Sequence, residues 1–244
     1  MAILNLDCYN PDNDESYSDG SIENELLECV KDPDYDWFND GRWPVVYHLS
    51  HLRHNILNWY PFEPGCSILE IGAGCGALTG LLCSRAENVK AIELTRRRAE
   101  INYERHKNCP NLEIVVGDFF QIPFRQKFDY VIVNGVLEYA AYMKHSANPY
   151  VDFLQTAASH LKDDGRLLLA IENRLGLKYF SGSREDHTGE YFSGLNNYSA
   201  GEKVRTFSKK ELKDVILDSG LYPIKFFYPY PDYKFPSEIF TDGS

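Results

Sequence analysis

The sequence has little of what would place a protein in a membrane or outside the cell. Its 244 residues include no run of about 18 consecutive apolar residues, the length that a membrane-spanning helix needs. The first residues lack the basic segment followed by an apolar segment that marks a secretory signal. The six cysteines form no C-x-x-C pair and no spacing typical of a metal site. We therefore expect a cytoplasmic protein with reduced thiols and no membrane insertion.

Positive charge is also scarce. Lys and Arg number 25 against 36 Asp and Glu, which leaves a formal net charge of −11. The imbalance lies within residues 1–40, which hold twelve acids and the single base Lys31. No basic surplus is left to hold a nucleic-acid backbone, so we expect no nucleic-acid partner. The acidic segment is interpreted as a solvated surface or as a docking surface.

An apolar segment that runs into three glycines is the strongest pattern present. Residues 67–71 predict a strand, Gly72, Gly74 and Gly76 follow it, and the next leucines are spaced as in a helix. Glycine serves where a turn needs φ > 0 or where backbone approaches a ligand, and a helix begins with unpaired N–H groups. Residues 67–82 therefore predict a ligand-binding strand, turn and helix.

Two kinds of ligand fit this turn. Gly72, Gly74 and Ala77 satisfy the relaxed pattern G-x-G-x-x-G/A, which predicts an NAD-dependent oxidoreductase. Glu70 stands two residues before the first glycine, where a carboxylate would repel a pyrophosphate but attract a cation. The position of Glu70 favours a cationic ligand over NAD.

Four further apolar segments alternate with helical ones and end at polar residues. They cover residues 89–93, 111–116, 127–134 and 166–171. This alternation indicates an α/β fold with a mainly parallel sheet, helices on both faces and a site at the carboxyl ends of the strands. Segments 222–230 and 235–240 predict an antiparallel pair that completes a sheet of seven strands. Glu93, 21 residues after Gly72, is suited to accept both ribose hydroxyls of an adenosine cofactor.

In order and spacing, these motifs resemble those of class I S-adenosylmethionine (SAM) methyltransferases. The resemblance covers residues 65–172 and is carried by residues 69–76, Glu93, Gly117-Asp118, 128–130, 136–139 and 161–167. It implies a Rossmann-like fold, SAM as cofactor and methyl transfer as the activity. The predicted cofactor-binding residues are Glu70, Gly72, Ala73, Gly74, Gly76, Glu93, Leu94, Gly117, Asp118, Phe119, Asn134, Gly135 and Val136. Asp118 is expected to accept from the adenine amino group, and Phe119 to pack on the adenine ring.

Residues 1–60 are predicted to form an acidic arm and a helical cover, ahead of a methyltransferase domain over residues 61–244. Residues 7–20 read as a loop, and a helix is expected after Pro44. On that helix His48 and His51 would share one face, either as partly buried surface residues or as part of the substrate cavity. No metal is predicted, because no carboxylate or cysteine lies at a metal-ligand spacing from these histidines.

The 36 residues of 172–207 exceed an ordinary connection and predict a substrate insert after the fifth strand. Together with residues 205–208, they resemble a bacterial methyltransferase subfamily that is found alone or joined to glycosyltransferases of cell-surface polysaccharide synthesis. Members of that subfamily commonly continue past the equivalent of Thr241, which leaves open whether the chain is a module of a longer protein. The shared motifs are Glu172-Asn173-Arg174-x-Gly176-x-Lys178-Tyr179, Glu185-Asp186-His187-x-Gly189 and Arg205-Thr206-Phe207-Ser208.

These observations predict a SAM-dependent O-methyltransferase for a sugar or glycan-linked intermediate, with a fused or partner glycosyltransferase. Oxygen is favoured because residues 134–137 lack the Asn/Asp-Pro-Pro-Tyr/Phe motif of nitrogen methylation. His187 is predicted as the base, oriented by Asp186, with Glu172 as the third catalytic residue. The predicted substrate-binding residues are His48, His51, Glu138, Tyr139, Arg174, Lys178 and Tyr191. A methyltransferase for an unrelated small metabolite and a SAM-binding scaffold for a glycosyltransferase are the alternatives.

Overall fold

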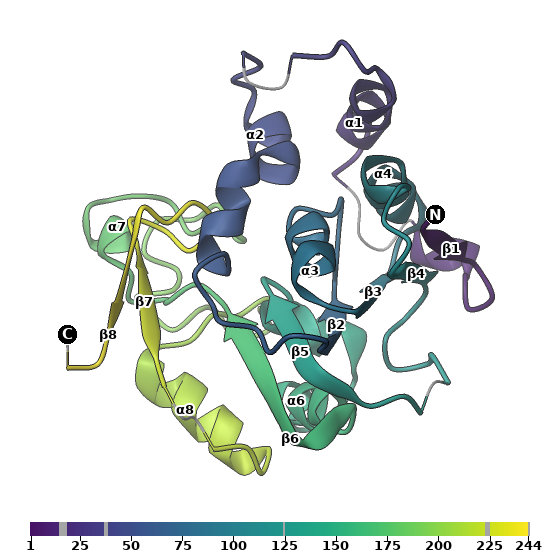
Figure 1. The fold of residues 1–244 in the computed structure, drawn as a ribbon. Helices are drawn as coiled ribbons and strands as arrows, with labels where there is room; N and C mark the ends of the chain where they lie inside the picture. Colours follow the sequence, from purple (N-terminus) through teal and green to yellow (C-terminus); the bar gives the residue numbers. More distant parts are fainter. Residues whose placement is uncertain (15–18, 37–38, 124, 223–224, 244) are drawn as a thin grey trace.

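Six parallel strands form the central sheet (Figure 1). The structure is a computed structural model that describes residues 1–14, 19–36, 39–123, 125–222 and 225–243. The spatial order of the strands is β1-β4-β3-β2-β5-β6. The strands are β1 (Ile3–Asn5), β2 (Ser67–Ile71), β3 (Asn88–Glu93), β4 (Leu112–Val116), β5 (Phe128–Asn134) and β6 (Leu161–Ala170). This arrangement confirms the predicted Rossmann-like, mainly parallel sheet.

Helices cover both faces of the sheet, because successive side chains of a strand point to opposite faces. Ile68 of β2 packs in one core cluster with residues of α3 (Thr79–Arg85) and α4 (Arg96–His106). Leu69, the next residue, packs in the other cluster with residues of α6 (Pro149–Ala158) and α8 (Lys209–Asp218). The predicted two-sided cover is therefore confirmed.

The chain order reverses between β2 and β5. From β2 the sheet continues through β3 and β4 to β1, whereas from β5 it continues through β6 in the opposite direction. In open α/β sheets, ligands bind outside the carboxyl ends of the strands at such a reversal. The segments that leave these two strands, residues 72–76 and 135–138, therefore occupy the position of a ligand site.

The prediction of a seven-stranded sheet is wrong for the described residues. β7 (Phe227–Tyr230) and β8 (Glu238–Thr241) pair antiparallel with each other in a separate sheet. Pro229 lies within β7 and has no N–H to donate, which suits a two-stranded ribbon better than the interior of a large sheet. The sixth strand of the main sheet is instead β1, which pairs with β4. Residues 223–224 of the predicted segment lie outside the described residues.

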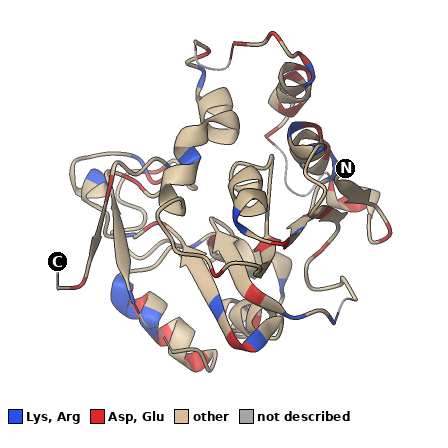
Figure 2. Ribbon diagram, viewed as in Figure 1, with Lys and Arg blue, Asp and Glu red and all other residues tan. Residues whose placement is uncertain are grey.

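The N-terminal segment covers the glycine turn. α1 (Ile22–Lys31) and α2 (Trp43–Leu49) bury Leu26 and Leu49 in one cluster with Cys75 of the turn. Figure 2 shows acidic positions along α1 and the loop that follows it. The predicted loop over residues 7–20 includes η1 (Pro11–Asn13), and its residues 15–18 lie outside the described residues.

The single helix expected after Pro44 is interrupted. α2 ends at Leu49, the backbone of Ser50 is extended, and a 3-10 helix, η2 (His51–Ile56), follows. The Ser50 hydroxyl accepts from the backbone N–H of Leu52 at 3.2 Å and so offers an alternative to continued helix. His48 and His51 therefore lie on two different helices and do not share one helical face.

Between β6 and α8 the described chain contains one short helix, α7 (Leu177–Phe180). η3 (Leu137–Tyr139) and α5 (Ala140–Met143) follow β5. α8 begins with a capping box, in which Ser208 and Glu211 bond each other's backbone N–H groups. Among the described residues, no helix is long and apolar enough to cross a membrane.

Candidate active site

The turn after β2 is built from glycines in the left-handed region. Gly72, Gly74 and Gly76 have φ angles of 71°, 54° and 79°. A side chain at Gly72 would collide with Val136, and one at Gly76 would collide with Asn102. A Cβ at Gly74 would meet no described atom within 4 Å. The turn is therefore tightly packed at two positions and open at the third, where backbone can approach a ligand.

Glu93 lies beside this opening, at the end of β3. Its Oε2 accepts from the Gly74 N–H at 2.8 Å, and its Oε1 accepts from the Thr95 N–H and Oγ1 at 3.0 and 3.1 Å. The Glu93 residue is only 4% exposed. Each carboxylate oxygen has two acceptor positions, and three of the four are filled, so Glu93 Oε2 retains capacity for one ribose hydroxyl.

Glu70 supports the turn from inside the protein. Its Oε2 accepts from Thr79 Oγ1 at 2.6 Å, and Thr79 Oγ1 in turn accepts from Asn102 Nδ2 at 3.0 Å. Burial raises the pKa of Glu70 to about 7. The carboxyl group thus ties the end of β2 to the start of α3, and its predicted contact with a cationic ligand stays a prediction.

Asp118 and Phe119, which follow β4, have structural partners. The Asp118 carboxylate accepts from the Phe120 N–H at 2.9 Å and from Gln121 Nε2 at 2.7 Å. Phe119 is 7% exposed and packs against Phe153 of α6 with ring centroids 5.7 Å apart. The Phe119 ring is a core side chain rather than an exposed platform, so it does not supply the open ring face that the predicted stacking requires.

The end of β5 carries an unsatisfied acceptor. Asn134 Oδ1 is buried and has no hydrogen-bond partner among the described residues. Gly135 has a φ of 69°, and a Cβ there would come within 2.8 Å of the Tyr233 hydroxyl oxygen. Buried acceptors are normally paired, so Asn134 is suited to receive a donor from a ligand. The open turn, Glu93 and Asn134 together fit an adenosyl cofactor with a positively charged end.

A cluster of three titratable residues, two of them buried and one half-buried, adjoins Gly135. It consists of Glu138 from η3, Glu172 after β6 and His187 from the long segment before α8. One carboxylate or ring-nitrogen atom of each lies within 4.8 Å of the others. Glu138 is 1% exposed and Glu172 is 5% exposed, and the Oε2 atom of each has no hydrogen-bond partner among the described residues. We call these three residues the Glu-Glu-His cluster.

His187 is oriented by Glu185 and not by Asp186. His187 Nδ1 lies 3.0 Å from Glu185 Oε1, and His187 Nε2 lies 3.7 Å from Glu138 Oε1. The Glu185 carboxylate also accepts the His187 and Thr188 N–H groups at 2.8 and 2.7 Å. The prediction that Asp186 orients His187 is therefore wrong, because the hydrogen-bond partner of His187 Nδ1 is the Glu185 carboxylate.

The charge state of His187 bears on its predicted role as a base. Burial lowers the pKa of His187, but the nearby carboxylates of Glu138 and Glu185 outweigh burial and raise the pKa to about 10. With these neighbours alone the imidazole is protonated at neutral pH. A protonated imidazole takes up no further proton, so the carboxylates of the cluster are better suited to that task.

Two lysines and two further carboxylates surround the cluster. Lys234 Nζ contacts Glu172 Oε1 and lies 2.7 Å from Asp186 Oδ2. Lys178 Nζ lies 2.8 Å from Asp186 Oδ2 and 2.7 Å from Asp232 Oδ2. Sequence reasoning missed Glu185 and Lys234, because no spacing connects them with Glu138 or Glu172.

The other predicted substrate residues fall into two groups. The Tyr139 ring lies at the cluster, with its centroid 5.6 Å from that of His187. His48 Nε2 pairs with Asp19 Oδ2 at 3.0 Å, whereas His51 is exposed and packs edge-on against His54. Those two histidines therefore make contacts away from the cluster.

Arg174 and Tyr191 also have partners of their own. Arg174 Nε and Nη2 bind the Glu211 carboxylate at 2.7 and 3.1 Å. Tyr191 is 52% exposed, and the Arg184 guanidinium lies 4.4 Å from its ring centroid. The substrate roles of these two residues stay predictions.

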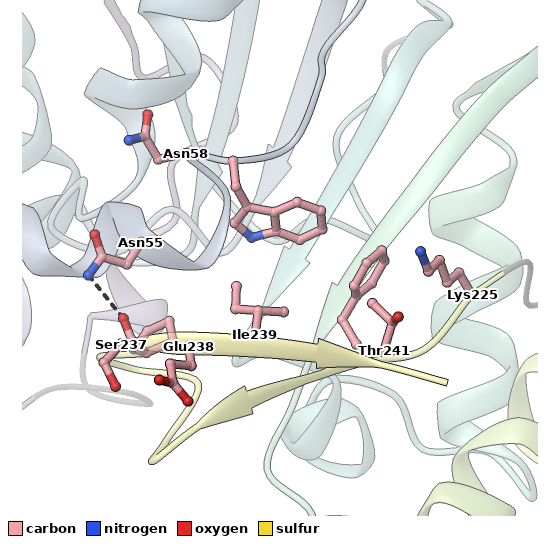
Figure 3. Close-up of a pocket in the computed structure, with 10 residues that line it drawn as sticks. Asn55, Asn58, Lys225, Ser237, Glu238, Ile239 and Thr241 are labelled. Carbon is pink, nitrogen blue, oxygen red and sulfur yellow. Dashed lines mark hydrogen bonds between the residues drawn. The ribbon is translucent and has the colours of Figure 1, made fainter. Parts of the chain in front are cut away.

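A shallow groove of about 620 Å³ lies elsewhere, between η2 and the β7–β8 hairpin (Figure 3). Asn55 Nδ2 crosses it to donate to the backbone oxygen of Pro236 at 3.0 Å. Its lining residues are Asn55, Asn58, Trp59, Lys225, Phe227, Pro236, Ser237, Glu238, Ile239 and Thr241, none of which belongs to the sites described above.

Comparison with known proteins gives consistent results. A family model described as "Methyltransferase domain" matches residues 69–169. An "Uncharacterized methyltransferase" of Staphylococcus carnosus is 31% identical over 202 residues, which cover 81% of this chain and 91% of the relative. A "Ubiquinone biosynthesis O-methyltransferase" of Rickettsia prowazekii is 21% identical over 208 residues, covering 82% and 79%. In structure, phosphoethanolamine N-methyltransferase 1 of Haemonchus contortus, solved with S-adenosylhomocysteine, matches with a TM-score of 0.52 and 17% identity, covering 87% of this chain and 42% of that one.

Proposed function

The chain belongs to the class I SAM-dependent methyltransferases, and we propose that it methylates a hydroxyl oxygen of a sugar or glycan-linked acceptor. SAM, when bound, supplies a methyl group on a positively charged sulfur. We assign Glu93 to a ribose hydroxyl, Asp118 to the adenine amino group and Asn134 to the cationic end. The glycine turn, open at Gly74, allows the close backbone approach that such binding needs.

The observation that carries the proposed acceptor is the pair of unpartnered carboxylate oxygens in the Glu-Glu-His cluster. Glu138 Oε2 and Glu172 Oε2 are buried acceptors without a donor among the described residues. Hydroxyl groups are donors of the right kind, and an acceptor with neighbouring hydroxyls would satisfy both oxygens. As the new carbon–oxygen bond forms, the hydroxyl proton passes to one of these carboxylates.

The sequence motifs that resemble the polysaccharide-associated subfamily support the same acceptor class. They supply Glu172, Lys178, Glu185, Asp186 and His187, which build the cluster and its surroundings. We therefore propose that the acceptor belongs to bacterial cell-surface polysaccharide synthesis and that a glycosyltransferase is the fused or interacting partner.

The test is methyl transfer to a panel of nucleotide sugars, polyprenyl-linked sugars and oligosaccharides, with S-adenosylhomocysteine release and product mass as readouts. Catechols, other phenols and small amines form the comparison panel. We expect a methylated sugar, and we expect His187→Ala to abolish its formation while SAM affinity is kept. Turnover of only the comparison panel would support an unrelated metabolite, and SAM binding without any turnover would support a scaffold.

A further inference from the structure

We propose that Glu138, Glu172 and His187 bind a divalent metal ion of the Mn²⁺ or Mg²⁺ class, which ligates the acceptor oxygen. This inference rests on the proposed oxygen acceptor for its role: with the ion bound, the acceptor oxygen reaches the cluster through the ion instead of through direct hydrogen bonds to both carboxylates. The binding of the ion does not depend on the acceptor. The donor set is two carboxylates and one imidazole. Carboxylates suit Mg²⁺ and Mn²⁺, and the imidazole shifts the preference toward Mn²⁺.

The spacing of the three side chains suits one ion. Their ligand atoms lie within 4.8 Å of one another. An octahedral ion with bonds of about 2.1 Å places neighbouring ligand atoms about 3 Å apart and opposite ones about 4.2 Å apart. Small side-chain rotations bring the cluster to these distances.

The unpartnered oxygens are the second and independent observation. Glu138 and Glu172 are both more than nine-tenths buried, yet Oε2 of each lacks a hydrogen-bond partner among the described residues. Tyr179 is 2% exposed and lies near the same charges, and its hydroxyl group also lacks a partner among the residues that the structure describes. A buried carboxylate without a partner is costly, and metal coordination is one of the ways in which proteins offset that cost.

His187 is held as metal-binding histidines are held. Glu185 is a carboxylate and accepts from Nδ1, so the proton of that nitrogen is committed and Nε2 is directed at Glu138. Metal-ligating histidines almost always donate their second N–H to a carboxylate or carbonyl in this manner. Lys234 holds the other oxygen of Glu172 in a similar way.

The net charge around the Glu-Glu-His cluster is negative and favours the binding of a cation. Two ammonium groups and one imidazole face a larger number of carboxylates, so negative charge is in excess even when His187 is protonated. The groups are Lys178, Lys234 and His187 against Glu138, Glu172, Glu185, Asp186 and Asp232. A divalent ion reduces this excess after His187 Nε2 gives up its proton to solvent, and it retains open positions for an acceptor oxygen.

The test is titration of the full chain, freed of metal with EDTA, with Mn²⁺ while free Mn²⁺ is followed by electron paramagnetic resonance. We expect one Mn²⁺ per chain and a raised melting temperature. Glu138→Gln and His187→Gln should lose this binding, and Glu185→Gln, which changes a positioning residue, should weaken it by about 10- to 100-fold. Glu113→Gln, at the distant pairing of β1 with β4, is the matched control and should bind as the wild type does.

The proposal is overturned if the wild-type chain takes up no Mn²⁺, or if the cluster variants bind it as well as Glu113→Gln does. Circular dichroism and SAM binding of each variant separate loss of the site from loss of the fold. Because Mn²⁺ is titrated without acceptor, binding by the wild type stands even if no sugar is methylated. Conversely, sugar methylation that is unaffected by EDTA in a chain that binds no Mn²⁺ overturns the metal alone.

Discussion

The two halves of the proposed site, a cofactor half and an acceptor half, are built in opposite ways. The cofactor half is formed by consecutive residues at the ends of neighbouring strands, with Gly72 to Gly76 after β2 and Glu93 at the end of β3. The acceptor half is formed by Glu138, Glu172, His187 and Lys234, which come from separate segments of the chain. The first half is a local motif carried by the sheet, whereas the second exists only once distant loops have packed together.

The largest effect on methyl transfer is expected from a substitution that removes a charge from the acceptor half. Glu138→Gln should lower methyl transfer by about 100- to 10,000-fold, since it removes a proton acceptor and cluster charge, and should leave the SAM dissociation constant within about twofold. Steady-state rates and titration calorimetry measure the two quantities. Turnover close to that of the wild type would show that Glu138 has no role in the reaction.

A substitution in the cofactor half should have the opposite pattern, with a loss of SAM affinity and little loss of maximal rate. Glu93→Gln should weaken SAM binding by about 10- to 100-fold, because hydrogen bonds to a charged acceptor are worth about 1.5–3 kcal/mol. Methyl transfer at saturating SAM should recover most of its rate. A variant that binds SAM normally but turns over slowly would contradict the division between the halves.

Acid should affect the cofactor half first, through His106 behind the glycine turn. Its Nδ1 lies 2.8 Å from Asn102 Oδ1, and burial, followed by the charge of Arg105, lowers the pKa of His106 to about 3. The folded state therefore binds fewer protons than the unfolded state below the ordinary histidine pKa of about 6.5. Stability should fall by up to about 1.4 kcal/mol per pH unit as the pH drops from about 6 toward 4.

Denaturant unfolding at several pH values measures this slope. In His106→Gln the free energy of unfolding should fall less steeply between pH 6 and pH 4. At pH 8, where His106 is neutral in both states, it should change little. A slope that is identical in the variant would assign the acid sensitivity to other groups, such as His54, whose pKa burial also lowers, to about 4.

The smallest effect is expected at a residue that belongs to neither half. His51 is exposed, and its ring packs edge-on against the ring of His54. His51→Ala should change turnover and SAM affinity by less than about twofold, as surface substitutions generally do. A loss of ten-fold or more in turnover alone would restore the substrate role that the sequence predicted for this side chain.

Sequence reasoning succeeded where local pattern and long-range structure agree. The strands around the glycine turn follow from periodicity and fixed spacings, and the structure contains them. Sequence reasoning failed for the strands whose place in a sheet depends on tertiary packing. β1 is only three residues long and gains its place by pairing with β4, whereas the β7–β8 hairpin pairs only with itself in the described sheets.

The sequence by itself determined the local geometry that we propose for the cofactor, because a strand, a glycine turn and an acid at the end of the next strand need only neighbours along the chain and one parallel pairing. Only the tertiary structure decided the acceptor half. Glu185 rather than Asp186 orients His187, and His187 meets Glu138 and Glu172, because the segment before α8 folds back onto the ends of β5 and β6. Contacts of that kind depend on how loops pack, and no period or spacing in a sequence records them.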